Sequence, residues 1–85
     1  MLELHLTNKA LEDLTYWVKQ DRKLALKVLL LLDEITKTPF EGTGKPEPLK
    51  YALQGCWSRR LTGEHRLVYK VEKQKIIVLA CRYHY

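Results

Sequence analysis

The apolar residues at the start of the chain change from a spacing of two to a helical spacing. Leucines alternate with polar residues over positions 2–6, which predicts a short strand with one buried face. Thr7 and Asn8 are good helix N-cap residues, so a helix is expected from there to about Gln20. The apolar positions of this helix are Ala10, Leu11, Leu14, Trp17 and Val18.

A second helix is predicted from a cap at Asp21 to about Lys37, and Pro39 stops it from continuing. At about 100° per residue, Leu26 and Leu30 fall opposite the main apolar stripe, among charged residues. Two leucines there suggest an interface for a partner chain, although isolated surface leucines are common. The main stripe, which is expected to face the core, consists of Leu24, Val28, Leu31, Leu32 and Ile35.

The second half of the chain changes to a period of two. Residues 39–48 hold all three prolines and two glycines, and they are expected to form an ordered connector. Short turns between the later apolar runs imply antiparallel pairing. The predicted strands span residues 49–53, 56–61, 65–71 and 76–83. The predicted fold is one α+β domain over residues 1–85, ordered β-α-α-β-β-β-β, with two N-terminal helices packed on one face of a mostly antiparallel sheet.

Composition agrees with one small domain. The chain has 85 residues, of which 46% are hydrophobic, enough for a single core. Cys56 and Cys81 do not make a disulfide scaffold, and no Cys/His spacing is typical of zinc. Charges interrupt the apolar residues of positions 1–20, and the leucine run at 29–32 is too short to span a bilayer. These features predict a cytoplasmic protein with free thiols and no membrane partner.

Positive charge is concentrated in the second half. Residues 1–43 carry six Lys/Arg and seven Asp/Glu, whereas residues 44–85 carry nine Lys/Arg against three Glu, a net charge of +6. This asymmetry favours a polyanionic partner, above all nucleic acid, over a merely soluble basic surface.

The last five residues combine groups that handle phosphates and protons. Arg82 can pair with phosphate, and His84 titrates near neutral pH. The rings of Tyr83 and Tyr85 can stack on a base. A strand that merely runs out at the chain end is the plainer interpretation.

A carboxylate, a guanidinium and an imidazole are expected to meet in the basic half. Glu47 lies between two prolines whose rings hold the backbone nearly rigid. Period two places Arg66 on the sheet face opposite Leu67 and Tyr69, which look like the core face. His84 is expected at the end of the neighbouring strand. Further positive charge near them, and contacts with the phosphates of RNA, are expected from Lys45, Lys50, Arg59, Arg60 and Arg82.

These three groups suffice for RNA cleavage without a metal or cofactor. A base takes the proton of a ribose 2′-OH, the oxygen attacks the adjacent phosphorus, and an acid protonates the departing 5′-oxygen. A cation offsets charge on the phosphorane. No aspartate cluster or His/Asp ligand set marks a metal site, which favours this route. Ordinary interpretations remain for each residue: Glu47 as a solvated loop acid, Arg66 as a simple phosphate contact, and His5 and His65 as structural.

Five stretches resemble the YoeB toxins of the RelE/ParE superfamily. The resemblance covers essentially the whole chain and is most specific in the second half. The stretches are residues 38–42 (TPFEG), 44–50 (GKPEPLK), 57–60 (WSRR), 64–69 (EHRLVY) and 80–85 (ACRYHY).

The resemblance implies a toxin of a bacterial type II toxin–antitoxin pair, neutralised by a YefM-like antitoxin and often dimeric. Such toxins enter the A site of the 70S ribosome and cut mRNA there. By position, Glu47 matches the general base, Arg66 the transition-state arginine and His84 the general acid. The other matching positions are the terminal tyrosine, Tyr85, and the basic residues Lys50 and Arg60.

The sequence therefore predicts a ribosome-dependent mRNA endoribonuclease. Two alternatives stay open: a ParE-like toxin that inhibits DNA gyrase without cutting RNA, and a non-catalytic RNA- or ribosome-binding module. Neither alternative needs Glu47, Arg66 and His84 together, so this combination favours the nuclease.

Overall fold

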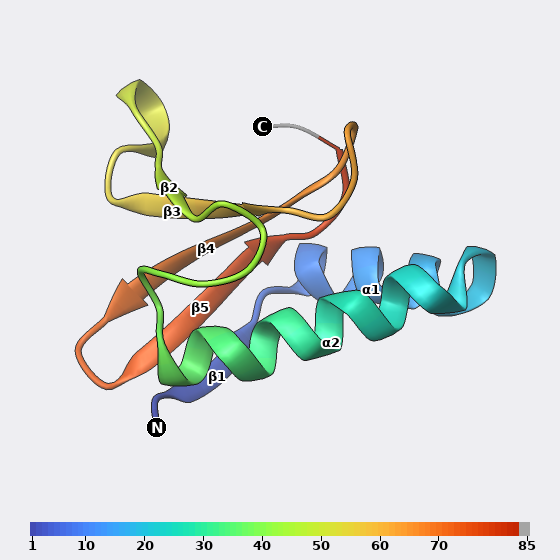
Figure 1. The fold of residues 1–85 in the computed structure, drawn as a ribbon, viewed down its shortest axis with the longest axis horizontal. Helices are drawn as coiled ribbons and strands as arrows, with labels where there is room; N and C mark the ends of the chain where they lie inside the picture. Colours follow the sequence, from blue (N-terminus) through green and yellow to red (C-terminus); the bar gives the residue numbers. More distant parts are fainter. Residues whose placement is uncertain (84–85) are drawn as a thin grey trace.

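The computed structural model describes residues 1–83 and places two helices on one face of a five-stranded sheet (Figure 1). The strand order is β1-β5-β4-β3-β2, in which β1 and β5 are parallel and all other pairs are antiparallel. This confirms the predicted α+β class and the order β-α-α-β-β-β-β. In chain order the elements are β1 (Glu3–Leu6), α1 (Asn8–Gln20), α2 (Arg22–Lys37), β2 (Glu47–Pro48), the 3₁₀ turn η1 (Tyr51–Leu53), β3 (Cys56–Arg60), β4 (Arg66–Glu72) and β5 (Lys75–Ala80).

Polar side chains set the limits of both helices, as the sequence predicts. The Thr7 hydroxyl accepts the N–H of Ala10 at 3.1 Å and starts α1. Asp21 serves both helices. Its backbone N–H donates to the Trp17 carbonyl at the end of α1, and its carboxylate accepts the N–H of Leu24 at 3.2 Å. Within residues 1–83, neither helix is long and apolar enough to cross a membrane.

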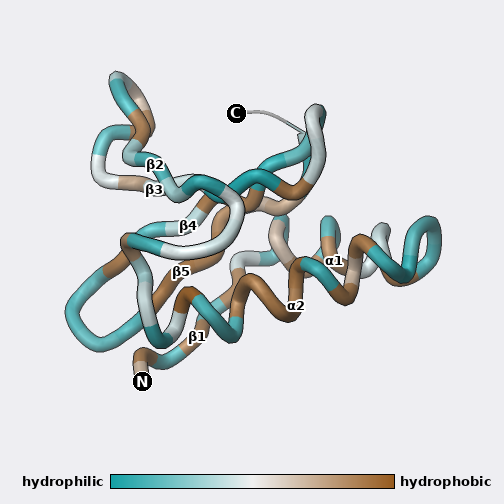
Figure 2. The backbone as a smooth tube through the Cα atoms, viewed as in Figure 1, coloured by the Kyte–Doolittle hydropathy of each residue, from teal (hydrophilic) through white to brown (hydrophobic). Residues whose placement is uncertain are grey.

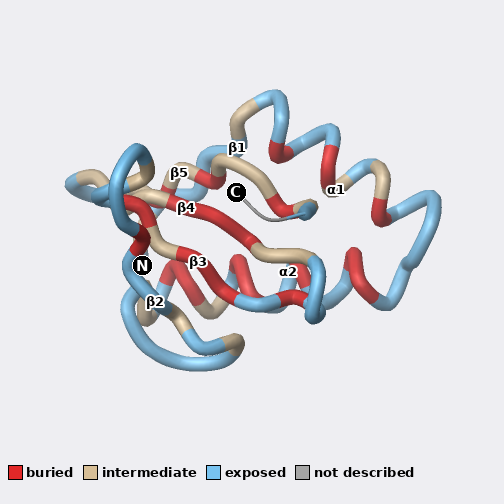
Figure 3. Tube along the Cα trace, turned by 90° about the horizontal axis from the view of Figure 1, so that it is seen from above, coloured by how far each residue is buried: buried red, intermediate tan, exposed pale blue. Residues whose placement is uncertain are grey.

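The main core lies between the helices and the sheet, and Figure 3 shows burial along β3, β4 and the inner turns of the helices. All five residues of the apolar stripe predicted for α2 are buried. The prediction for α1 is correct only in part, since Ala10 and Trp17 are buried but Leu11 and Val18 are exposed. Leu14 is half-buried against the core, so the buried stripe of α1 is narrower than predicted. The sheet contributes Leu67, Tyr69, Ile76 and Val78 to this core.

β1 forms as predicted, but its expected buried face does not. All four of its residues are exposed, Leu4 and Leu6 included. β1 is an edge strand that pairs only with β5, so the helices covering the sheet centre leave it open to solvent. Leu2, which precedes the strand, packs against the core instead.

The strand predicted over residues 49–53 is wrong. Pairing with β3 comes earlier, where Glu47 lies opposite Ser58, and it ends when the Leu49 N–H donates to the Cys56 carbonyl at 2.9 Å. Leu49 and Cys56 then join a small second cluster with Val68, on the sheet face away from the helices.

Beyond Leu49 the chain turns through η1 instead of extending. Tyr51 has a φ of +58°, in the left-handed region, which a strand does not contain. The N–H groups of Leu53 and Gln54 donate to the carbonyls of Lys50 and Tyr51, at 3.2 and 3.0 Å, and close the turn. β2 and this turn project away from the helices (Figure 1).

The last strand ends at Ala80 instead of continuing to residue 83, because α1 takes the hydrogen bonds of Cys81. The buried Asp13 carboxylate accepts the Cys81 N–H at 3.0 Å. The Trp17 indole N–H donates to the Cys81 carbonyl at 2.8 Å. Burial raises the pKa of the Cys81 thiol to about 12, so this thiol stays protonated and packs as a small apolar group.

Candidate active site

Glu47 and Arg66 meet on the sheet face opposite the helices. Arg66 Nη1 lies 3.2 Å from Glu47 Oε1. The register explains the contact, because Glu47 on β2 is opposite Ser58, and Arg66 on β4 is opposite Arg60 two residues further along β3. The Glu47 side chain is 54% exposed and that of Arg66 is 18% exposed, so a substrate can reach both.

Ser58 lies between Glu47 and Val68 in the register of the sheet. Its side chain has no exposed surface, and its hydroxyl has no hydrogen-bond partner among residues 1–83. It therefore adds an unpaired hydroxyl next to the Glu47 strand, a feature that the sequence did not single out.

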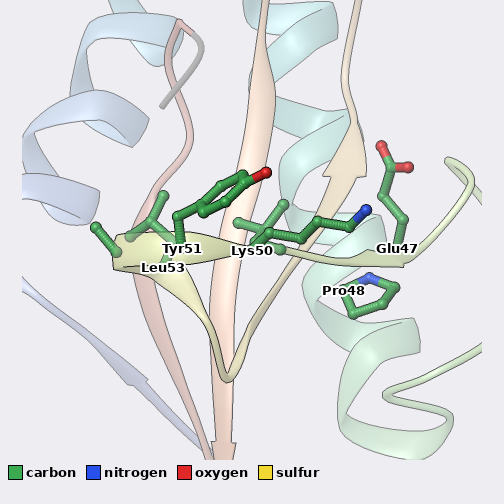
Figure 4. A pocket seen from close by; sticks show the side chains of 7 residues that line it. Glu47, Pro48, Lys50, Tyr51 and Leu53 are labelled. Atoms are coloured by element: carbon green, nitrogen blue, oxygen red, sulfur yellow. The ribbon is translucent and has the colours of Figure 1, made fainter.

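A groove of about 460 Å³ opens beside Glu47 along β2 and η1. Figure 4 shows the side chains of Glu47, Lys50 and Tyr51 on the same edge of this segment. Its lining residues are Glu47, Pro48, Leu49, Lys50, Tyr51, Ala52 and Leu53. The groove combines the carboxylate of Glu47, the ammonium group of Lys50 and the exposed aromatic ring of Tyr51.

Three of the residues predicted to contact RNA are exposed around this site. They are Lys45, before β2, Lys50, in the groove, and Arg60, opposite Arg66 in the β3–β4 register. Their positions suit phosphate contacts, and their role in RNA binding stays a prediction.

The segment that leads to the C-terminus is held beside Arg66. The Tyr83 N–H donates to His65 Nδ1 at 2.7 Å, and the Arg66 N–H donates to the Tyr83 carbonyl at 3.2 Å. The His65 ring also packs edge-on against Trp17, with centroids 4.7 Å apart. His65 is therefore more than a core residue, since it fixes the residue directly before His84.

The predicted acid His84 and the terminal Tyr85 lie outside the described residues, so their roles stay predictions. Arg82 is half-buried, with its guanidinium carbon 3.5 Å from the Tyr16 ring centroid and 4.7 Å from that of Tyr83. Two cation–π contacts hold this side chain at the protein surface. Its predicted contact with RNA is likewise untested. His5 is exposed, as expected, and bonds the Glu3 carboxylate.

The prediction that Arg59 contacts RNA is wrong. Its side chain has no exposed surface, and its guanidinium lies on the helix side of the sheet, 2.7 Å from the Glu34 carboxylate. Its Nε donates to the Tyr69 hydroxyl at 3.3 Å. The remaining acceptors are the carbonyls of Thr38, Glu41 and Thr43, at 2.7, 2.9 and 3.2 Å. Consecutive strand residues face opposite sides of a sheet, so the pair Arg59-Arg60 itself signalled that one arginine points inward.

We call Arg59, Glu34 and Tyr69 the Arg59 cluster. Glu34 accepts the Thr43 N–H at 2.6 Å, and this backbone bond, with the Arg59 guanidinium, holds the Glu34 pKa below its usual value against the effect of burial. The Tyr69 hydroxyl donates to the Pro39 carbonyl at 2.6 Å, and burial raises the pKa of Tyr69. The cluster therefore ties the connector before Glu47 to the sheet.

Gly42 lets the connector backbone lie close to the Glu34 carboxylate. Its φ is +121°, and a Cβ at this position would lie 1.9 Å from Glu34 Oε1. Any larger residue would displace the Glu34 carboxylate from Arg59.

Two helices on one face of a five-stranded, mostly antiparallel sheet give the chain the RelE-like fold. A family model described as "YoeB-like toxin of bacterial type II toxin-antitoxin system" matches residues 6–85. The chain therefore belongs to the YoeB-like toxins of bacterial type II toxin–antitoxin systems.

Individual members of the family are similar to this chain over nearly its whole length. The chain is 46% identical to Toxin YoeB of Escherichia coli K12, over 99% of this chain and 100% of that protein. The solved YoeB/ParE toxin from Agrobacterium tumefaciens is 42% identical and superposes with a TM-score of 0.95, covering 99% of this chain and 100% of the other.

The Staphylococcus aureus YoeB is similar as well, and it has been solved in two assemblies. The YoeB dimer is 42% identical, with a TM-score of 0.90 and coverage of 99% and 98%. The YoeB-YefM complex is 41% identical, with a TM-score of 0.89 and coverage of 100% and 99%.

Proposed function

We propose that the chain is an endoribonuclease that cuts mRNA in the A site of the 70S ribosome and thereby inhibits translation. The observation that carries this proposal is the Glu47–Arg66 pair, 3.2 Å apart on an exposed sheet face. The excess positive charge of residues 44–85 supports an RNA substrate. The full-length relatives named above are toxins. A substrate on the ribosome places the activity in the cytoplasm.

The chemistry needs no metal or cofactor. Glu47 takes the proton of the ribose 2′-OH, and the resulting oxygen attacks the adjacent phosphorus. The Arg66 guanidinium neutralises charge on the phosphorane, since it keeps donors that no protein group occupies in residues 1–83. His84 donates a proton to the departing 5′-oxygen, which leaves a 2′,3′-cyclic phosphate and a free 5′-hydroxyl. Tyr85 and the basic residues around the groove hold the RNA strand.

The test is single-turnover cleavage of mRNA on programmed ribosomes. Glu47→Ala and His84→Gln should each lower the rate by roughly 10²-fold or more, because positioned proton transfer contributes about 10²–10⁴. Ribosome binding should change much less. Glu72→Ala is a matched control, since Glu72 is also an exposed acid in an ion pair, with Lys70 at 2.8 Å. Wild-type rates in both active-site variants would refute the assignment, as would induced cells whose mRNA 5′ ends show no translation-dependent cuts.

The proposal includes two protein partners, a YefM-like antitoxin and a second copy of the chain. The dimer and the YefM complex of the 42% and 41% identical relative support both. On α2 the leucines that the sequence singled out, Leu26 and Leu30, are exposed together with Leu29. Figure 2 shows hydrophobic and hydrophilic positions interspersed along α2. Residues three and four apart share one helix face, so these leucines form one apolar face. We assign this face to the second copy, because a dimer interface is more apolar than the remaining surface.

Replacing Leu26 and Leu30 by Lys should weaken self-association while the fold remains, because neither side chain belongs to the core. Sedimentation and the melting temperature measure the two effects. If the double variant loses antitoxin binding but still dimerises, the leucine face binds the antitoxin and not the second copy. If neither dimerisation nor antitoxin binding changes, the leucine face is not an interface.

A further inference from the structure

We propose that the Tyr51 ring is a stacking platform for a base of the A-site codon, beside the Glu47–Arg66 pair. This inference rests on the proposed function and adds to it a residue that reads the RNA substrate. The first observation is exposure. Tyr51 exposes 91% of its surface, the largest value among the exposed large apolar side chains of residues 1–83. The ring therefore contributes almost nothing to the core and is accessible to a ligand.

The backbone under Tyr51 is held in an uncommon conformation. Its φ of +58° is in the left-handed region, which costs free energy for a residue with a side chain. Two hydrogen bonds, Leu53 N–H to the Lys50 carbonyl and Gln54 N–H to the Tyr51 carbonyl, close the turn around it. Leu49, which precedes the turn, is buried against Val68 on the sheet. Cys56, which follows the turn, is buried in the same cluster. Both ends of the turn are therefore anchored, and the ring is presented on a defined backbone.

The ring lies in the groove that contains the acid of the proposed reaction. Glu47, Lys50 and Tyr51 line the same cavity of about 460 Å³, and their side chains share one edge of the segment (Figure 4). A cavity of this size is within the range that holds small ligands. An RNA strand with its 2′-OH at Glu47 would place a neighbouring base over this groove.

The chemistry of the groove favours a nucleotide over a protein partner. Tyr51 supplies a flat face for a base, and the exposed ammonium of Lys50, the adjacent residue, supplies charge for a phosphate. Alternating rings and cations are typical of surfaces for single-stranded nucleic acid, and the second half of the chain has a net charge of +6. A protein interface of the same size would be depleted of charged residues at its centre.

The experiment compares Tyr51→Ala, which removes the ring, with Tyr51→Phe, which keeps it. Binding is measured on ribosomes programmed with mRNA whose A-site codon carries 2′-deoxyribose, so that no cleavage occurs. A parallel series replaces each A-site nucleotide in turn by an abasic one. Stacking of one base is worth enough that Tyr51→Ala should bind the intact codon roughly 10-fold more weakly. Tyr51→Phe should bind like wild type, and all three proteins should melt at the same temperature, because the ring is outside the core.

The abasic series provides the decisive comparison. Wild type and Tyr51→Phe should lose about the same roughly 10-fold in affinity when one particular base is removed, whereas Tyr51→Ala should be insensitive to it. Equal sensitivity in wild type and Tyr51→Ala would overturn the platform. So would a Tyr51→Ala protein that is defective only in antitoxin binding, because the surface would then belong to a protein partner. Neither result touches the proposed nuclease, which is tested separately by whether wild type cuts the ribose form of the same mRNA.

Discussion

The molecule contains two arginine–carboxylate pairs, one buried and one within reach of solvent. Arg59 lies 2.7 Å from Glu34 and Arg66 lies 3.2 Å from Glu47. Arg59 is fully buried and bonds five acceptors, whereas Arg66 makes a single side-chain hydrogen bond within residues 1–83. The first pair has no donor left for a substrate, and the second has several. The comparison teaches that unused hydrogen-bonding capacity in reach of solvent distinguishes the pair that we propose to be functional, whereas the presence of an ion pair does not.

The two pairs are also connected along the chain. The Arg59 cluster holds the connector carbonyls from Thr38 to Thr43, and β2 begins with Glu47 four residues later. Arg60, the neighbour of Arg59, donates its backbone N–H to the Gly44 carbonyl at 2.7 Å. The buried pair thus supports the backbone that carries the exposed pair.

The largest effect is expected where the buried pair is broken. Arg59→Leu should lower the free energy of unfolding by about 3 kcal/mol, because it leaves the Glu34 carboxylate and several carbonyls without their donor. The lower end of the usual range applies, since the Glu34 side chain remains 32% exposed. Denaturant unfolding measures this. Arg60→Leu is the matched control and should change stability by no more than about 0.5 kcal/mol. Equal stabilities of the two variants would contradict the anchoring role.

The exposed pair should show the reverse pattern. Arg66→Ala should lower single-turnover cleavage by roughly 10²–10³-fold, the usual effect of removing one group that stabilises transition-state charge. The same change should cost at most about 1 kcal/mol of stability, because exposed ion pairs contribute little. Cleavage rates and unfolding curves of one preparation decide the matter. A large loss of stability with normal cleavage would reverse the assignments of the two arginines.

An intermediate effect is expected at His65, which joins a packed ring to the open site. His65→Phe keeps a ring against Trp17 but removes the acceptor for the Tyr83 N–H. One such hydrogen bond is worth about 0.5–1.5 kcal/mol, so cleavage should fall roughly 3- to 10-fold with ribosome binding unchanged. His65→Asn restores an acceptor and should recover part of the rate. If Phe and Asn behave alike, the Tyr83 contact does not position the terminus.

A smaller effect separates the neighbouring arginines by their response to salt. Arg60→Ala should reduce the slope of log affinity for RNA against log salt by about one unit, as expected for one lost phosphate contact. Lys19→Ala, an exposed cation at the end of α1, should leave the slope unchanged. Arg59→Lys, provided that it folds, should also leave the slope unchanged, because Arg59 does not reach solvent. If the Arg60→Ala and Lys19→Ala variants lower the salt dependence of RNA affinity equally, Arg60 makes no specific phosphate contact.

The smallest effect is the pH dependence contributed by Glu34. Its pKa is lower in the folded protein than its ordinary value of 4.5, so its contribution to stability is complete above that pH. The contribution is lost as the pH falls from about 4.5 through the folded pKa, where the carboxylate takes up a proton. Unfolding measured from pH 7 to 3 should show a shallower decline in Glu34→Gln than in wild type. Parallel declines would assign the acid sensitivity to other carboxylates.

Local signals in the sequence predicted much of the fold. Thr7 and Asp21 mark the helix limits because capping depends only on residues within one turn. The apolar stripe of α2 and the core face of β4 follow from side-chain periodicity. For the site, period two predicts the face on which Arg66 lies, and Glu47 is singled out both by its place between two prolines and by the family resemblance. Charge counting located the basic half of the chain.

The tertiary structure decided the features that depend on residues far apart in sequence. Periodicity says which residues share a face but not which face is covered, and so β1 was wrongly given a buried face. The burial of Arg59 depends on Glu34, 25 residues earlier, and the position of Tyr83 depends on His65, 18 residues earlier. Leu49, just before the turn at Tyr51, is buried against Val68 of β4, a contact that the sequence does not indicate. The sequence states which functional group a residue carries, but residues far away in the sequence decide how many of its hydrogen-bond donors stay free. In this protein, that difference distinguishes the buried Arg59, which anchors the connector, from Arg66 of the proposed active site.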